Sequence, residues 1–351
     1  MSLIESGSSL AVFRTCPKKY EFEYDMRLST KSYPSAMGLG SFVHGLVEDY
    51  RKHNSSGFVN AIREFRTKFP AAEEQITADI QKAQSIFRAW MLYWESVDSE
   101  SFGENNMAFS EVETEWAYEL PNGKHVGKRD GYLQNTKTGK HYLYELKTSA
   151  ASGEENYIHR LGLDHQISAN ITALQKEGKP VDGVLYDIIF KPMIRLKKGE
   201  TAAEFSERFA ATMLAEPEAY FKRVLVDRLP HALEQYNEET NQVFGLIEAG
   251  YRYRNTSACM KFNSLCPFFN ACMDPGIPEL LNDFNKREDK FPELREANVI
   301  TNQEGIANEH PQAESVSVRP AGQREDPVPG FFGDGDPLAD HVSRKRTPFS
   351  S

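Results

Sequence analysis

The pattern of residues 109–147 constrains the fold most, because helical periodicity gives way there to alternation. Apolar and polar residues alternate over part of segment 109–120, and two more strand-like segments, HVGKRDGYL and HYLYELKTS, follow on either side of the turn-rich NTKTGK. Alternation with a period of two is typical of half-buried strands, and a turn-rich connection joins the strands of a hairpin. The sequence therefore predicts three strands, the last two of which form a hairpin.

Helical segments surround these strands. Ser8 or Ser9 is expected to cap a short first helix, and Ser41 to cap a second one after a loop with Gly38 and Gly40. Apolar residues three and four positions apart predict further helices. These predicted helices span about residues 73–96, 156–177 and 201–254, the last of them broken by Pro217 and Pro230. The apolar segment VDGVLYDIIFKP is expected to be a buried strand that ends at Pro192.

Composition and charge exclude several classes of protein. The chain of 351 residues carries 41 basic and 51 acidic side chains, and its net charge of −10 argues against a polybasic coat for nucleic acid. No apolar run approaches the roughly 18 residues of a membrane span, and the start of the chain lacks the pattern of a secretory signal. We therefore expect a cytoplasmic protein with no membrane partner.

The last 51 residues differ from the rest of the chain. Segment 301–351 is rich in acidic residues and proline and poor in large apolar residues, which predicts disorder. Its short basic cluster SRKR indicates either a solvated tail or a segment that docks on a partner or on DNA. Residues 1–275 are expected to form the main domain, with residues 276–300 as an extension.

The predicted hairpin brings ionisable side chains together. In HYLYELKTS, Glu145 and Lys147 point to one face of the strand, and a turn near residues 137–138 places Asp130 opposite Tyr144 or Glu145. Cross-strand neighbours have Cβ atoms about 4.5–5.5 Å apart, so the two carboxylates come close. They repel each other unless they share a proton or a cation, and hard oxygen ligands suit Mg²⁺ or Mn²⁺. The alternative is that Glu145 and Lys147 form an ordinary exposed ion pair.

Five short motifs in order resemble the PD-(D/E)xK nuclease superfamily, and more narrowly its RecB-type branch. The motifs are a histidine after a glycine loop, a lone aspartate, E-x-K and a glutamine on a helix, with a cysteine set around them. The first four stand here as GSFVH (40–44), KRDG (128–131), ELK (145–147) and QISAN (166–170). Asn170 occupies the place where the branch usually has tyrosine.

This resemblance implies a fold and a role for each residue. The fold would be an α/β restriction-endonuclease-like core, a central mixed sheet flanked by helices, with helical additions at about residues 50–100 and 200–255. Asp130, Glu145 and the Leu146 carbonyl would hold the metal, with His44 as a further ligand. Lys147 would position and help to activate the attacking water. Gln166 would steady the site or the DNA backbone.

Four cysteines form a second candidate site. Cys259, Cys266 and Cys272 follow the nuclease motifs with the spacing C-x6-C-x5-C, and Cys16 precedes them in CPKKY. Four thiolates suit zinc or an iron–sulfur cluster, and they can also be free thiols in a reducing compartment. The layout resembles that of RecB-type nucleases with a [4Fe–4S] cluster, including AddB and the CRISPR-associated RecB-like exonucleases. The resemblance therefore implies a structural [4Fe–4S] cluster.

The predicted function is metal-dependent hydrolysis of DNA, by an exonuclease on ends or single strands in recombination, repair or phage DNA processing. The alternatives are an endonuclease of the same fold and a non-catalytic DNA-binding or scaffold subunit. A helicase or a single-strand annealing protein is a possible partner. Candidate DNA contacts are basic, amide or aromatic residues: Lys18, Lys19, Asn170, Arg195, Lys197, Lys198, Tyr251, Arg252, Tyr253, Arg254 and Lys261.

Overall fold

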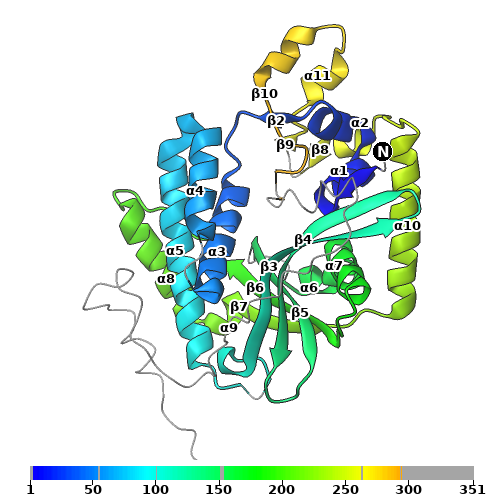
Figure 1. Cartoon of the computed structure of the whole chain (residues 1–351). Helices are drawn as coiled ribbons and strands as arrows, with labels where there is room; N and C mark the ends of the chain where they lie inside the picture. Colours follow the sequence, from blue (N-terminus) through cyan, green and yellow to red (C-terminus); the bar gives the residue numbers. More distant parts are fainter. Residues whose placement is uncertain are drawn as a thin grey trace, which may run out of the picture.

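A single six-stranded mixed sheet forms the centre of the computed structural model, with helices packed on both faces (Figure 1). The structure describes residues 3–53, 56–99, 101–150, 154–261, 264–292 and 294. The predicted α/β class and central mixed sheet are thus confirmed. The predicted tail at 301–351 lies outside the described residues. Within them, no helix has both the length and the apolar character that a membrane span requires.

Ten strands and eleven α-helices are described, and short 3₁₀ or π turns connect some of them. The strands are β1 (Ile4–Ser6), β2 (Leu28–Thr30), β3 (Met107–Leu120), β4 (Gly123–Asn135), β5 (His141–Ala150), β6 (Gly183–Lys191), β7 (Phe221–Val226), β8 (Met260–Lys261), β9 (Ser264–Leu265) and β10 (Phe284–Lys286). The helices are α1 (Gly7–Thr15), α2 (Pro17–Tyr20), α3 (Ser35–Lys52), α4 (Gly57–Lys68), α5 (Glu73–Ser96), α6 (Glu154–Leu161), α7 (His165–Lys176), α8 (Ala202–Ala215), α9 (Pro217–Tyr220), α10 (Pro230–Glu248) and α11 (Phe269–Met273).

Strand β4 has two different partners along one of its edges. On the other edge it pairs with β3 over nearly its whole length. On the shared edge, residues 131–134 pair with β5, whereas residues 124–126 pair with β1, which runs parallel to β4. Strand β5 continues beyond this point and pairs with β6 as far as Ala150. The strands β4 and β5 therefore separate after the pair Gly131–Tyr144 and leave a fork between them.

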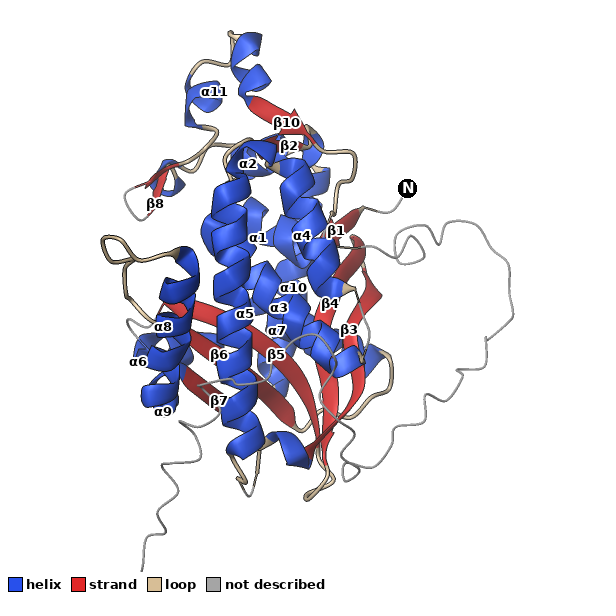
Figure 2. Ribbon diagram, turned by 90° about the vertical axis from the view of Figure 1, so that its left-hand side faces the viewer, coloured by secondary structure: helices blue, strands red, loops and turns tan. Residues whose placement is uncertain are grey.

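Alternating side chains bind a different helical layer to each face of the sheet. Tyr144 and Leu146 belong to the core under α3, α4, α5 and α8, the helices on the left of Figure 1. Leu143 and Tyr186 belong to the core under α6, α7 and the start of α10. Figure 2 shows the first helical layer standing across the strands. On β4, Leu133 and Tyr132 belong to the same two cores, so buried packing holds both strands of the fork.

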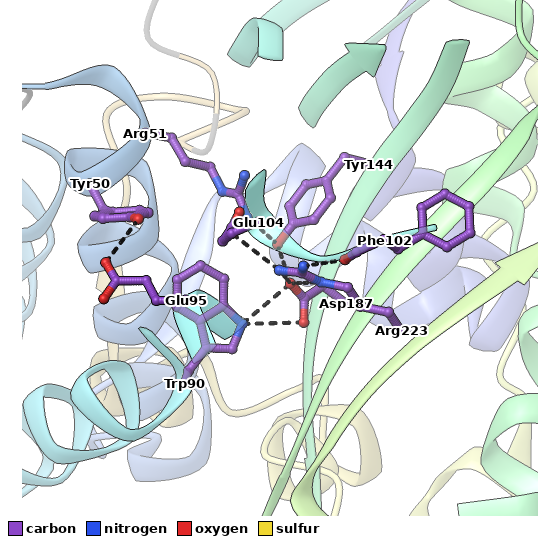
Figure 3. A network of polar contacts seen from close by, with 9 residues as sticks. All are labelled: Tyr50, Arg51, Trp90, Glu95, Phe102, Glu104, Tyr144, Asp187 and Arg223. Carbon is purple, nitrogen blue, oxygen red and sulfur yellow. Dashed lines mark hydrogen bonds and ion pairs between the residues drawn. The ribbon is translucent and has the colours of Figure 1, made fainter. Parts of the chain in front are cut away.

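A buried polar network ties the first helical layer to the sheet (Figure 3). The Arg223 guanidinium of β7 donates to the Asp187 carboxylate of β6 at 2.8 and 3.0 Å, and both side chains are at most 2% exposed. The Trp90 indole of α5 and the Tyr144 hydroxyl of β5 also donate to Asp187, at 3.2 and 3.0 Å. Glu104 accepts a 3.1 Å bond from Arg223. The charges are therefore paired and hydrogen-bonded, as buried charges must be.

Glu104 extends this network to the helix that carries His44. Arg51 of α3 donates to Glu104 and to the Tyr144 hydroxyl, at 3.1 and 3.2 Å. Its guanidinium also lies 3.8 Å from the centre of the Phe109 ring. Burial raises the pKa of Glu104, but the guanidinium groups of Arg51 and Arg223 outweigh it and hold the pKa below its ordinary value. Arg51 therefore fixes α3 against β5 two helical turns from His44.

Several predicted boundaries are wrong, for local reasons. Helix α1 begins at Gly7, because the Ser6 side chain accepts from the Ser9 amide in a capping box. Helix α3 begins at Ser35, not at Ser41, and the expected loop is helical. Gly38 serves close packing, since a Cβ there would overlap the Tyr33 ring.

The remaining differences lie farther along the chain. The single helix expected over 156–177 is divided into α6 and α7, which Asp164 separates as the N-cap of α7. Segment 221–226, predicted to be helical, is the strand β7 at the edge of the sheet. By contrast, α5 spans residues 73–96 and β6 ends just before Pro192, as predicted.

Candidate metal centre and active site

The Asp130 carboxylate occupies the fork between β4 and β5. Beyond the pair Gly131–Tyr144 no backbone pairing joins the two strands, so the Leu146 amide donates a 2.8 Å hydrogen bond to Asp130 Oδ2 instead. The Asp130 side chain remains 13% exposed. The strand geometry thus aims one carboxylate into the opening and fixes it by a backbone donor, which keeps the acid oriented for a ligand.

Glu145 lies on the neighbouring strand beside Asp130 and is almost completely buried. Its Oε1 accepts a 2.5 Å bond from the Lys147 ammonium, whereas its Oε2 is buried without a hydrogen-bond partner. Burial first, and the Asp130 charge second, raise the pKa of Glu145 to about 8. A buried carboxylate oxygen with no donor is costly. A cation between Asp130 and Glu145 would satisfy it and remove the repulsion that raises the pKa.

The Lys147 ammonium is held in place by two hydrogen-bond acceptors and one further carboxylate. Besides Glu145, it donates to Gln166 Oε1 of α7 at 2.9 Å and lies 3.8 Å from Asp164 Oδ2. Burial lowers the pKa of Lys147, but the Glu145, Asp164 and Asp130 charges outweigh it and raise the pKa above its ordinary value. Lys147 is therefore a charged donor at neutral pH, suited to orienting a water or a phosphate oxygen.

His44 and Glu113 complete the group from the other side of Asp130. His44 Nδ1 lies 3.7 Å from Asp130 Oδ2, and burial lowers the pKa of the His44 imidazole. Ligand atoms of His44, Glu113 and Asp130 all lie within 4.8 Å of one another. Burial and the Asp130 charge raise the pKa of Glu113 to about 7, against the opposing effect of its ion-pair partner Lys128.

This donor set fits a divalent cation. Ligands at about 2.1 Å from a Mg²⁺ ion are separated by about 3–4 Å, and His44 Nδ1 and Asp130 Oδ2 lie 3.7 Å apart. The neutral imidazole, the carboxylates and the unsatisfied Glu145 oxygen are hard or borderline ligands that suit Mg²⁺ or Mn²⁺. The residues present therefore fit the metal that the sequence predicted.

The structure brings together His44, Asp130, Glu145, Lys147 and Gln166, the five side chains predicted for the centre. Leu146 joins them through its amide, and the role of its carbonyl stays a prediction. Sequence reasoning missed two neighbours. Asp164 was hidden because the break between α6 and α7 was not recognised. Glu113 was hidden because its orientation depends on a backbone conformation unusual for a strand.

Asn170 does not lie where a DNA contact needs it. Its side chain is fully buried and its Oδ1 accepts a 2.8 Å bond from the Trp116 indole. The prediction of a DNA contact at Asn170 is therefore wrong. Gln166 at the start of α7 faces solvent, whereas Asn170, one turn farther along, lies in the core. Its Nδ2 has no partner among the described residues.

The other candidate DNA contacts lie in separate parts of the chain: Lys18 and Lys19 in α2, Arg195, Lys197 and Lys198 between β6 and α8, and residues 251–254 after α10. Tyr251 and Tyr253 are exposed, at 52% and 60%. Lys18 and Lys19 pair with glutamates one turn farther along, and Arg252 pairs with Asp25 at 2.6 Å. These pairs are partly exposed and weak, so DNA phosphates could replace them. Their role in binding DNA stays a prediction.

The four cysteines lie in the small segment that contains α2, β8, β9 and α11, at the top of Figure 1. All four are partly exposed and unpaired by disulfides. The Asn255 amide donates to Cys16 Sγ at 3.4 Å, and Cys266 and Cys272 pack against the buried cluster around Phe268. Burial raises the pKa of the Cys266 thiol, with smaller effects from Cys16 and Cys259.

The cysteine sulfurs are not gathered into one close group. No three of them lie within 4.8 Å of one another in the described chain. Four thiolates around one zinc ion would be about 3.8 Å apart, so the arrangement does not match a zinc site. Sulfurs that ligate an iron–sulfur cluster stand farther apart, because several iron atoms lie between them. The predicted cluster thus stays a prediction.

A mixed sheet forked at an aspartate, with a glutamate and a lysine on the adjacent strand, has the acidic and basic residues in the order of the PD-(D/E)xK motif. The model of the PD-(D/E)XK nuclease superfamily matches residues 6–273, and the chain belongs to this superfamily. Its members are nucleases that use divalent metal ions. A comparison with curated proteins found no match.

Proposed function

We propose that the protein is a Mg²⁺- or Mn²⁺-dependent deoxyribonuclease of the RecB-type branch that degrades DNA from its ends or as single strands. The observation that carries the proposal is the presence of two acids on adjacent strands: Asp130, fixed by the Leu146 amide, and Glu145, whose buried Oε2 has no hydrogen-bond partner among the described residues. Lys147 stands beside this pair as a charged donor. The order of GSFVH, KRDG, ELK and QISAN supports the branch.

In the proposed hydrolysis, some side chains bind the cation and others orient the water and the phosphate. His44, Asp130 and Glu145 would hold the cation, which when bound polarises the phosphoryl group and acidifies the attacking water. Lys147 orients that water and the phosphate oxygen, and the 2.9 Å bond to Gln166 keeps its ammonium in position. The Lys147 ammonium is already fixed by Glu145 and Gln166 before DNA binds, so little reorganisation is needed as charge develops.

The charge of the chain favours a partner that delivers DNA. With a net charge of −10, long-range attraction to DNA is absent, and binding depends on local basic groups and the bound cation. A helicase or a single-strand annealing protein, acting in recombination, repair or phage DNA processing, fits this requirement.

Cleavage of end-labelled DNA tests the proposed activity. The full chain is incubated with linear duplex, single-stranded and covalently closed circular DNA, and with RNA, in Mg²⁺, Mn²⁺ or EDTA. We expect linear DNA to be shortened to small products with either metal and not in EDTA, while circles and RNA persist. Cleaved circles would establish an endonuclease instead. Retarded but uncleaved DNA in gel-shift assays would establish a non-catalytic binding protein.

We also propose that the four cysteines bind a structural [4Fe–4S] cluster. Two features support it: the order and spacing of the four cysteines in the sequence, and the 3.4 Å hydrogen bond that the Asn255 amide donates to Cys16 Sγ. Hydrogen bonds from backbone amides to ligating sulfurs are typical of such clusters. A cluster would join the segment of Cys16 to that of Cys272 and restrict the unfolded chain.

Anaerobic purification tests the cluster. We expect a brown protein with broad visible absorption and about four iron and four sulfide ions per chain. Replacing Cys266 by serine should bleach the colour and lower the unfolding temperature, because the link across the chain is lost. A colourless protein free of iron, or one that contains zinc, would contradict this assignment while leaving the nuclease proposal untouched.

A further inference from the structure

Strand β3 directs Glu113 toward the metal centre, and its backbone at this residue departs from normal strand geometry. We propose that Glu113 is a direct ligand of the cation held by His44 and Asp130, and that its strained backbone serves this contact. The inference deepens the proposed function and rests on it, since it concerns the cation of the same site.

The register of β3 and β4 places Glu113 across from Asp130. The pairs Val112–Gly131 and Thr114–Arg129 enclose the two acids on both sides. Glu113 and Asp130 thus face each other at the fork, and His44 of α3 approaches from the helical layer. The three ligand atoms lie within 4.8 Å of one another, so a single ion can contact all of them.

The backbone of Glu113 is strained where it meets the site. Its φ is +53°, in the left-handed region that non-glycine residues rarely adopt. The other two non-glycine residues described with positive φ, Arg27 and His53, lie outside strands. Such a conformation costs about 1 kcal/mol or more, and it persists where the surrounding structure or a function requires it. A glycine here would remove the strain but also the carboxylate.

The ion pair with Lys128 does not account for this strain. The Lys128 side chain is 30% exposed, and partly exposed ion pairs contribute little to stability. The carboxylates of Glu113, Asp130 and Glu145 outnumber the ammonium groups of Lys128 and Lys147 beside them. Glu145 on the neighbouring strand adds a buried carboxylate oxygen, Oε2, that has no hydrogen-bond partner among the described residues. A divalent ion at the fork balances the surplus negative charge.

Substitution of Glu113 by glutamine separates a metal ligand from a structural residue. Glutamine keeps the size of the side chain and removes its charge. The full chain is stripped with EDTA, and Mn²⁺ binding is measured by titration calorimetry, together with the rise of the unfolding midpoint on adding Mn²⁺. We expect Glu113→Gln to weaken Mn²⁺ binding at least about 10-fold. Without metal, the variant should unfold no lower than wild type, because like-charge repulsion is relieved.

Glu111→Gln is the matched control on the same strand. Glu111 pairs with Arg129 and Lys179, so its loss should lower the metal-free midpoint and leave Mn²⁺ affinity unchanged. If wild type binds Mn²⁺ and Glu113→Gln binds it equally well, or if the variant merely loses stability, Glu113 is not a ligand although the proposed function stands. If wild type itself binds no Mn²⁺, the proposed function fails.

Discussion

Lys147→Met is expected to lower the rate of DNA cleavage about 1,000-fold while Mn²⁺ still binds. Methionine keeps an apolar stem but removes the ammonium that Glu145 and Gln166 hold at 2.5 and 2.9 Å. The transition state then loses its oriented donor, whereas the carboxylates of the centre remain. The measurement is single-turnover cleavage of labelled linear DNA at saturating Mn²⁺, with Mn²⁺ affinity determined in parallel.

Two further variants define what the Lys147 result means. Glu145→Gln should abolish cleavage and weaken Mn²⁺ binding together, since it removes a proposed ligand. Lys140→Met changes an exposed lysine in the turn of the same hairpin and should leave both quantities unchanged. Cleavage by Lys147→Met at the wild-type rate would show that the ammonium takes no part in the reaction.

Arg223→Met is expected to be among the most destabilising single changes in the chain. It leaves the Asp187 carboxylate, which is 0% exposed, without its cation, and breaking a buried ion pair costs about 3–5 kcal/mol. In a domain of this size, such a loss lowers the unfolding midpoint by roughly 10 °C. Thermal unfolding followed by circular dichroism at neutral pH measures it.

An exposed ion pair provides the comparison. Arg66 and Glu73 are 47% and 55% exposed, and Arg66→Met should change stability by less than about 1 kcal/mol. The double variant Arg223→Met with Asp187→Asn should be less destabilised than the sum of its single changes, because no unpaired charge stays buried. Equal midpoints for Arg223→Met and Arg66→Met would mean that the network of Figure 3 contributes little to stability.

The hairpin could be predicted because its information is local. Alternation and the turn-rich NTKTGK fix the faces of Glu145 and Lys147, and a turn near residue 137 fixes the position of Asp130. Helix α5 could be predicted equally well, because its apolar residues recur at helical spacing over a long segment. These local signals were sufficient to assemble the core of the candidate metal centre.

Features set by distant parts of the chain could not be predicted in this way. Strand β7 carries two basic residues in FKRVLV, and only pairing with β6 and the burial of Arg223 make it a strand. The burial of Asn170 depends on Trp116, which is 54 residues away. The left-handed backbone of Glu113 leaves no signal in composition or periodicity, so sequence reasoning had no means to find this acid.

The pairing of β2 with β10 affects the order of folding during synthesis and the choice of fragments for expression. Leu28–Thr30 find their partner in Phe284–Lys286, beyond the last residue of the superfamily match at 273. During synthesis, the strands around Asp130 and Glu145 leave the ribosome well before β10 is made, and β2 has no strand to pair with until then. An expression fragment that stops at the apparent domain end would leave the edge of β2 open and invite aggregation.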